Sequence, residues 1–258
     1  MEQKDSENKP LVPPRLSNIY ENQPDRGTFS EPIVSADVKI VAQNNKQKSI
    51  ILQILNLLPK QHILDNDVLK AIVVSPDNSF LSKHNHKLGI IYLSQKLFSN
   101  SYTAKRPFHR IDSISSVVEL LTHEIGHSVE KNFFGDENKS FMKEFYWIYP
   151  LGRQQVSELA KRGYVSALTH FNNISSLDRA TLQPGDSEDI KNKIMQKYPM
   201  QKKGKEIKIS WYGGVGPKED FAESYVQYIF NNKNLLSIEN ERYNWMKDNV
   251  FNDQEFDT

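Results

Sequence analysis

Two histidines four residues apart lie in the middle of a segment with helical periodicity. His123 and His127 enclose Glu124 in the pattern H-E-x-x-H. On a helix, β-carbons four residues apart are about 5–6 Å from one another, so both imidazoles can bind a single ion. The pattern therefore predicts a zinc-binding helix, with Glu124 beside the ion as general base toward an activated water. The alternative is a pair of surface histidines around a solvated glutamate.

The limits of this helix can be predicted from its ends. Ser116 and Glu119 have the spacing of a capping box at the N-terminus, and Gly135 is a plausible stop. Between them, apolar residues recur on one helix face, at Val117, Leu120, Leu121, Ile125 and Val129.

A zinc helix of this kind needs a third protein ligand from elsewhere in the chain. Pro217 opens a second helical pattern in which Glu219 and Glu223 are again four residues apart. One carboxylate can bind zinc while the other accepts the free N–H of a ligand histidine. The alternative is an acidic first turn that only complements the helix dipole.

These motifs together resemble the gluzincin peptidases typified by the catalytic domain of anthrax lethal factor and by the Pro-Pro endopeptidases. The resemblance is carried by His123 to His127, by Glu219 to Ser224, and by Tyr212, which precedes the first glutamate by seven residues. It implies that His123, His127 and Glu219 bind one zinc ion and that Glu124 is the base. It also implies that Tyr212 supports the oxyanion and that Glu223 holds a ligand histidine.

The resemblance covers residues 46–258 and implies an α+β, zincin-like fold, mainly helical with a small mixed sheet and an active-site helix. The interval between His127 and Glu219 is longer than in the family, so residues 136–210 are expected to hold an insertion. Helical patterns at 141–148 and 154–171 fall within it, with interruptions at Pro150 and Gly163. Residues 1–45 contain five prolines among many polar residues and are predicted to form an extended or loosely docked arm.

Ahead of the zinc helix, the pattern predicts a helix at 50–58 and strands at 71–74 and 88–93. In zincin-like folds an edge strand beside the zinc helix can pair with an extended substrate. Gly89, Ile90, Ile91 and Tyr92 are therefore the predicted substrate-binding residues. His84 and His86 could form a strand-type metal pair, but their Lys and Asn neighbours favour an exposed turn.

Composition limits the partners. The 258-residue chain has a net charge of +1, so no broad field for nucleic acid or membrane is indicated. Cysteine is absent, which excludes thiolate zinc ligands and cysteine nucleophiles. No apolar stretch approaches the roughly 20 residues of a membrane span, and Met1–Pro10 lacks the apolar core of a signal peptide.

The sequence thus predicts a zinc metalloendopeptidase that cleaves a protein or peptide substrate. The resemblance implies an exported or secreted bacterial protease, a toxin or virulence effector delivered into a host cell to cut a host protein. The alternative is a catalytically silent zincin-like domain that binds a protein partner. An intact base and an oxyanion tyrosine argue against it, because a structural zinc site needs neither.

Overall fold

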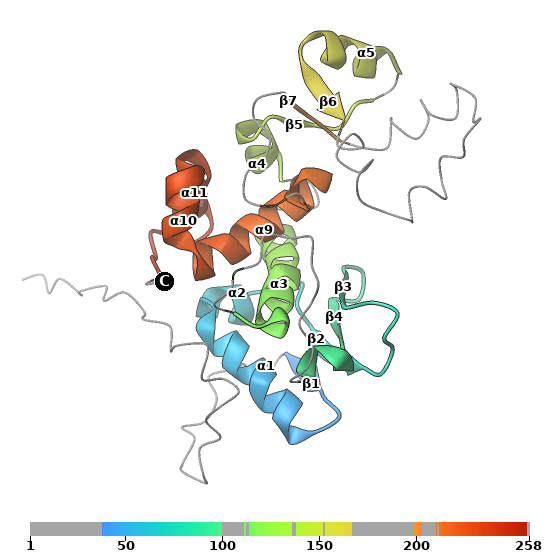
Figure 1. Ribbon diagram of the computed structural model, residues 1–258, viewed down its shortest axis with the longest axis vertical. Coiled ribbons are helices and arrows are strands. Elements are labelled where there is room, and N and C mark those ends of the chain that lie inside the picture. The colour runs from blue at the N-terminus through green and yellow to red at the C-terminus, as the bar shows by residue number, and fades with distance from the viewer. Residues whose placement is uncertain are drawn as a thin grey trace, which may run out of the picture.

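The computed structural model describes residues 38–99, 111, 114–135, 138–151, 153–166, 199–202, 210 and 212–256. It shows a mixed α and β protein with one larger and one smaller sheet. Figure 1 shows the helix of the H-E-x-x-H motif, α3, between the larger sheet and the C-terminal helices.

The larger sheet has the strand order β1-β2-β4-β3. Its strands are β1 (Lys39–Val41), β2 (Ala71–Ser75), β3 (Ser82–Asn85) and β4 (Ile90–Ser94). β1, β2 and β4 run parallel, and β3 pairs antiparallel with β4. Lys39–Val41 fall within the predicted N-terminal arm but form a strand of this sheet. Residues 1–37 of that arm lie outside the described residues.

A helical crossover joins the first two parallel strands, as parallel pairing requires. It consists of α1 (Asn45–Leu57) and α2 (Lys60–Leu64), and the Asn44 side chain caps α1 by accepting from the backbone N–H of Gln47. A tight turn precedes β4 at Gly89, where φ is +67° and a β-carbon would lie 2.2 Å from the Val68 carbonyl oxygen. Only glycine fits this turn.

The helix of the H-E-x-x-H motif, α3, spans Ser116–Phe134 and ends at Gly135, close to the predicted limits. Its N-cap residue is Ser115, whose side chain makes no capping hydrogen bond, so the capping box predicted at Ser116 and Glu119 is wrong. A short 3-10 helix, η2 (Gln95–Phe98), links β4 to the segment that precedes α3.

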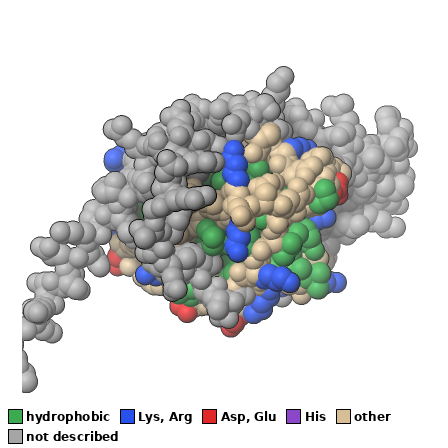
Figure 2. Space-filling model, turned by 90° about the horizontal axis from the view of Figure 1, so that it is seen from below, with side chains coloured by type: hydrophobic (Ala, Val, Ile, Leu, Met, Phe, Trp, Pro, Cys, Tyr) green, Lys and Arg blue, Asp and Glu red, His purple; other side chains and the backbone are tan. Residues whose placement is uncertain are grey.

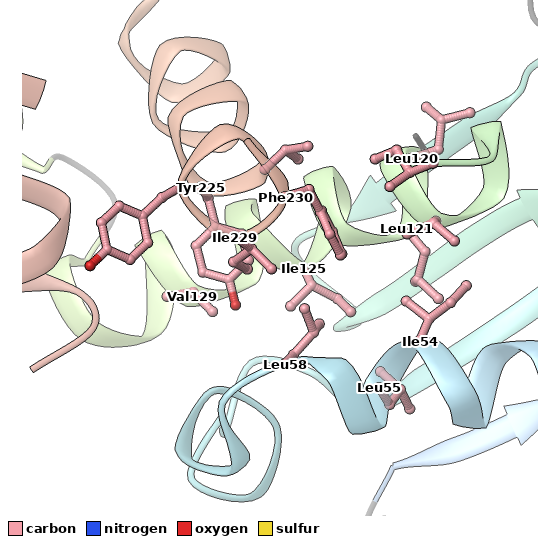
Figure 3. Close-up of a cluster of buried hydrophobic side chains, with 14 of the residues drawn as sticks. Ile54, Leu55, Leu58, Leu120, Leu121, Ile125, Val129, Tyr225, Ile229 and Phe230 are labelled. Carbon is pink, nitrogen blue, oxygen red and sulfur yellow. The ribbon is translucent and has the colours of Figure 1, made fainter. Parts of the chain in front are cut away.

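The main hydrophobic core lies between α3, the crossover helix α1 and the long C-terminal helix α9 (Pro217–Phe230). Figure 3 shows these three helices meeting through fully or nearly buried side chains: Ile54, Leu55 and Leu58 of the α1 segment, Leu120, Leu121, Ile125 and Val129 of α3, and Tyr225, Ile229 and Phe230 of α9. This packing fixes α9 along α3.

Two further helices close the C-terminal end, α10 (Asn232–Ile238) and α11 (Asn240–Asn249). The chain breaks between them at Glu239. Within the described residues, no helix is both long and apolar enough to cross a membrane.

The predicted insertion contains a second small sheet. Its described elements are α4 (Lys139–Glu144), β5 (Trp147–Ile148), α5 (Arg153–Lys161), β6 (Tyr164–Ser166) and β7 (Met200–Lys202). All three strands pair antiparallel in the order β5-β7-β6. The helix predicted over 141–148 is too long, since α4 gives way to β5. The break predicted at Gly163 is confirmed, because α5 ends at Lys161, but β6 follows where the pattern predicted more helix. Residues 167–198 lie outside the described residues.

Basic side chains are spread over one face of the molecule. Figure 2 shows Lys and Arg side chains of the described residues interspersed with hydrophobic ones on the face seen from below. They do not merge into one continuous basic patch on that face.

Candidate metal centre

Helices α3 and α9 come unusually close at Gly126, in the middle of the H-E-x-x-H motif. A β-carbon on Gly126 would lie 3.2 Å from the Ala222 α-carbon and 3.3 Å from the Tyr225 β-carbon. The glycine therefore allows the two backbones to approach. This approach lays the first turns of α9 beside the two histidines.

Three donor atoms converge where the helices meet. The Nε2 of His123 lies 3.1 Å from the Oε2 of Glu219, and the Nε2 of His127 lies 3.3 Å from the same oxygen. His123 and His127 are buried, and Glu219 is partly buried. Because the ligand atoms all lie within 4.8 Å of one another, this cluster can hold one metal ion.

Glu223 occupies the other side of His123. Its Oε1 lies 2.8 Å from Nδ1 of the imidazole, and both side chains are buried. A neutral His123 that donates from Nδ1 to Glu223 keeps its Nε2 lone pair directed toward Glu219 and His127. Of the two roles open to the glutamates, the structure thus places Glu219 among the ligand atoms and Glu223 behind the histidine.

The electrostatics of the cluster favour a cation. Burial alone would lower the pKa of His123, but the carboxylates of Glu219 and Glu223 outweigh it and hold that pKa well above its usual value. Burial would likewise raise the pKa of Glu219, yet His127 and His123 hold it far below its usual range. Two carboxylates around one imidazole require positive charge, which a proton or a metal ion supplies. The donor set of two imidazoles and one carboxylate is one that zinc accepts.

The two remaining predicted catalytic side chains border this cluster. Glu124 is buried on α3, next to His123. The ring of Tyr212 lies 5.8 Å from the His123 ring, between centroids. Tyr212 precedes the short 3-10 helix η3 (Gly213–Val215), and the N–H of Gly213 donates to the Ser210 hydroxyl at 2.9 Å. This turn holds the tyrosine beside the ligands.

A buried ion pair anchors the residue next to Glu219. Asp220 lies 2.6 Å from the guanidinium of Arg242 and accepts a hydrogen bond from the Trp147 indole N–H at 2.8 Å. All three side chains are at most 2% exposed. Burial raises the pKa of Asp220 to about 6, against the opposing effect of Arg242. Sequence analysis missed this network, because no spacing connects three residues from separate elements.

His84 and His86 also lie near the cluster. Their ring centroids are 4.3 Å apart, and the ring of His86 is 5.9 Å from that of His127. Both nitrogens of His84 are buried without a hydrogen-bond partner, and burial lowers its pKa to about 3. The expectation of a fully exposed turn is therefore wrong for this pair, which lies half-buried on the His127 side of the site.

The predicted substrate strand is not at an edge. Ile90, Ile91 and Tyr92 belong to β4, which is paired with β2 on one side and β3 on the other, and Gly89 lies in the preceding turn. Their backbone groups are thus occupied, and that part of the prediction is wrong. β3 is the edge strand on the side toward α3 among the described residues, and its polar sequence gave no strand signal.

Comparison with known proteins found no matching family model, no matching curated protein and no matching solved structure.

Proposed function

We propose that this protein is a zinc metalloendopeptidase with a zincin-like fold, of the gluzincin type that its motifs resemble. The observation that carries the proposal is the convergence of His123, His127 and Glu219 at one point, with Glu124 buried next to them. Two imidazoles and a carboxylate that lie this close together at a largely buried position suit a bound cation, which would satisfy all three groups at once.

The chemistry is divided between the ion and the chain. When bound, zinc supplies Lewis acidity, which polarises a peptide carbonyl and makes water more acidic. Glu124 then accepts the proton of the attacking water and passes it to the leaving amine. The Tyr212 hydroxyl donates a hydrogen bond to the carbonyl oxygen as negative charge develops on it. Glu223 holds His123 in the tautomer that presents Nε2 to the ion.

The edge of the larger sheet offers a way to bind an extended peptide. Among the described strands β3 pairs only with β4, and it contacts α3, so we propose that a substrate strand pairs with β3 through its backbone. Export and action on a host protein belong to the same proposal and rest on the resemblance of the motifs.

The proposal is tested by incubating a proteome with the wild-type protein or with Glu124→Ala and sequencing the new N-termini. The wild type should generate a defined set of cleavages that Glu124→Ala and chelator-treated protein do not. Zinc binding without any new N-terminus would overturn the proposal and favour the silent binding domain.

A further inference from the structure

A pocket of about 490 Å³ lies in the second small sheet, between α4, β5, α5 and β6. Its volume falls within the range of roughly 300–1,000 Å³ that is usual for ligand sites. The residues that matter for its chemistry are Lys139, Lys143, Tyr146, Trp147, Tyr149 and Leu151. Figure 1 shows these elements on the far side of α9 from the larger sheet.

Exposed apolar side chains gather at this pocket. Leu151 is 93% exposed, and Tyr149 and Tyr146 are 40% and 37% exposed. A grouping of large apolar side chains on the surface marks an interaction site more often than a single exposed residue does. Tyr146 has a φ of 60°, in the left-handed region, at the turn that follows the end of α4.

The rim of the pocket is basic. Lys139 and Lys143 are exposed and lie four residues apart on α4, so both can reach the same side. The ammonium of Lys202 lies 5.8 Å from the centre of the Tyr146 ring. None of the described residues that line the pocket is acidic. The charged side chains described at this rim are lysines, and an anionic partner suits them.

One wall of the pocket is connected to the candidate metal centre. Trp147 lines the pocket and donates its indole N–H to Asp220, the residue that follows Glu219. A ligand in the pocket would thus contact the same buried side chain that anchors the first turn of α9.

We propose that this pocket binds an apolar or aromatic side chain of a polypeptide segment that carries acidic residues on both sides. Aromatic anchors with a charged rim are the usual composition of a peptide-binding hot spot. The segment belongs to the substrate and lies away from the scissile bond. That identification rests on the proposed function, whereas binding itself requires no catalysis.

The test uses the full chain carrying Glu124→Ala and a fluorescein-labelled peptide of alternating Asp and Glu around one Phe and one Leu. Fluorescence anisotropy should show saturable binding that weakens with added salt. Tyr149→Ala and Leu151→Ala should each weaken it about tenfold or more, and reversing both charges with Lys139→Glu and Lys143→Glu should do the same. These side chains are exposed, so the variants should fold.

Matched controls on α10, Leu236→Ala and Lys233→Glu, should bind the peptide like the parent. The proposal is overturned if the pocket variants bind as well as these controls, or if a peptide with Lys in place of Asp and Glu binds equally well. Peptide binding at the pocket, together with no new N-termini in a proteome incubated with the wild type, would support the pocket and overturn the proposed function. Cleavage of short peptides by the wild type, with no binding of the labelled peptide at the pocket, would support the proposed function and overturn the pocket proposal.

Discussion

Each of the two ring nitrogens of His123 lies within hydrogen-bond distance of a carboxylate, and we expect the two carboxylates to have different roles in metal binding. Glu219 approaches Nε2 together with His127, whereas Glu223 approaches Nδ1 alone. We expect Glu219→Ala to abolish tight zinc binding, because a ligand is lost. Glu223→Gln should weaken it by only about 10–100-fold, since it alters the partner of a ligand. Competition with a chromophoric chelator measures both, and equal losses would contradict this division of roles.

Tyr212 can be tested through its hydroxyl alone. If that hydroxyl donates only to the developing oxyanion, Tyr212→Phe should lower kcat about a hundred- to a thousandfold, a cost of roughly 2.7–4 kcal/mol. Zinc content and KM should change little, because the ring remains beside His123. Single-turnover cleavage within about twofold of the wild-type rate would show that only the ring matters.

At the residue scale, the motif predicts the spacing of the two histidines and the resemblance places Glu219 beside them, whereas other contacts between elements were not predicted. The spacing of His123 and His127 places both side chains on the same face of the helix, because about one turn separates them. Asp220 is different, since its partners Trp147 and Arg242 lie in other elements and only the folded chain brings them together.

At the scale of elements, the site depends on the close packing of α3 and α9. Gly126→Val should destabilise the protein by about 1–3 kcal/mol and weaken zinc binding, because its side chain would force Ala222 and Tyr225 away. Gly126→Ala should cost less, since a helix favours alanine over glycine by about 1 kcal/mol. Chemical denaturation of the three proteins measures the series. A valine variant as stable as the wild type would contradict the role of this close approach.

The sheet shows where a prediction from pattern fails. The apolar runs of β2 and β4 identify strands but not their neighbours, and β4 was assigned to an edge that β3 occupies. Ser82–Asn85 has no apolar alternation, and none of its four residues is fully buried, so no apolar face marks it as a strand. The prediction therefore located a strand correctly and its pairing incorrectly.

At the scale of the whole molecule, His62 joins the N-terminal half to the C-terminal end. Its Nε2 donates to the Val250 carbonyl at 3.0 Å, and its Nδ1 lies 2.9 Å from the Tyr225 hydroxyl. Burial lowers the pKa of His62 to about 4 from 6.5. The folded state therefore holds this side chain neutral at a pH where the unfolded chain protonates it.

This difference predicts a pH dependence of folding. Above pH 6.5 His62 is neutral in both states, and the free energy of unfolding is not reduced by its titration. As the pH falls toward 4, that free energy decreases by up to about 3 kcal/mol, because the unfolded state binds a proton that the folded state does not. His62→Gln should remove this part of the decrease in unfolding free energy with falling pH. Urea denaturation between pH 4 and 7, with chelator present for both proteins, measures it. Parallel slopes for the two proteins would show that His62 does not contribute.

The central claim is that α3 and α9 together hold one metal ion. Anomalous diffraction from a crystal of the protein, collected on both sides of the zinc absorption edge, tests it most directly. The account predicts one zinc peak per chain, bonded to Nε2 of His123, Nε2 of His127 and a carboxylate oxygen of Glu219, with Glu124 adjacent but not bonded. Protein grown with sufficient zinc and purified without chelators that shows no peak there, or a peak held by other residues, would contradict it.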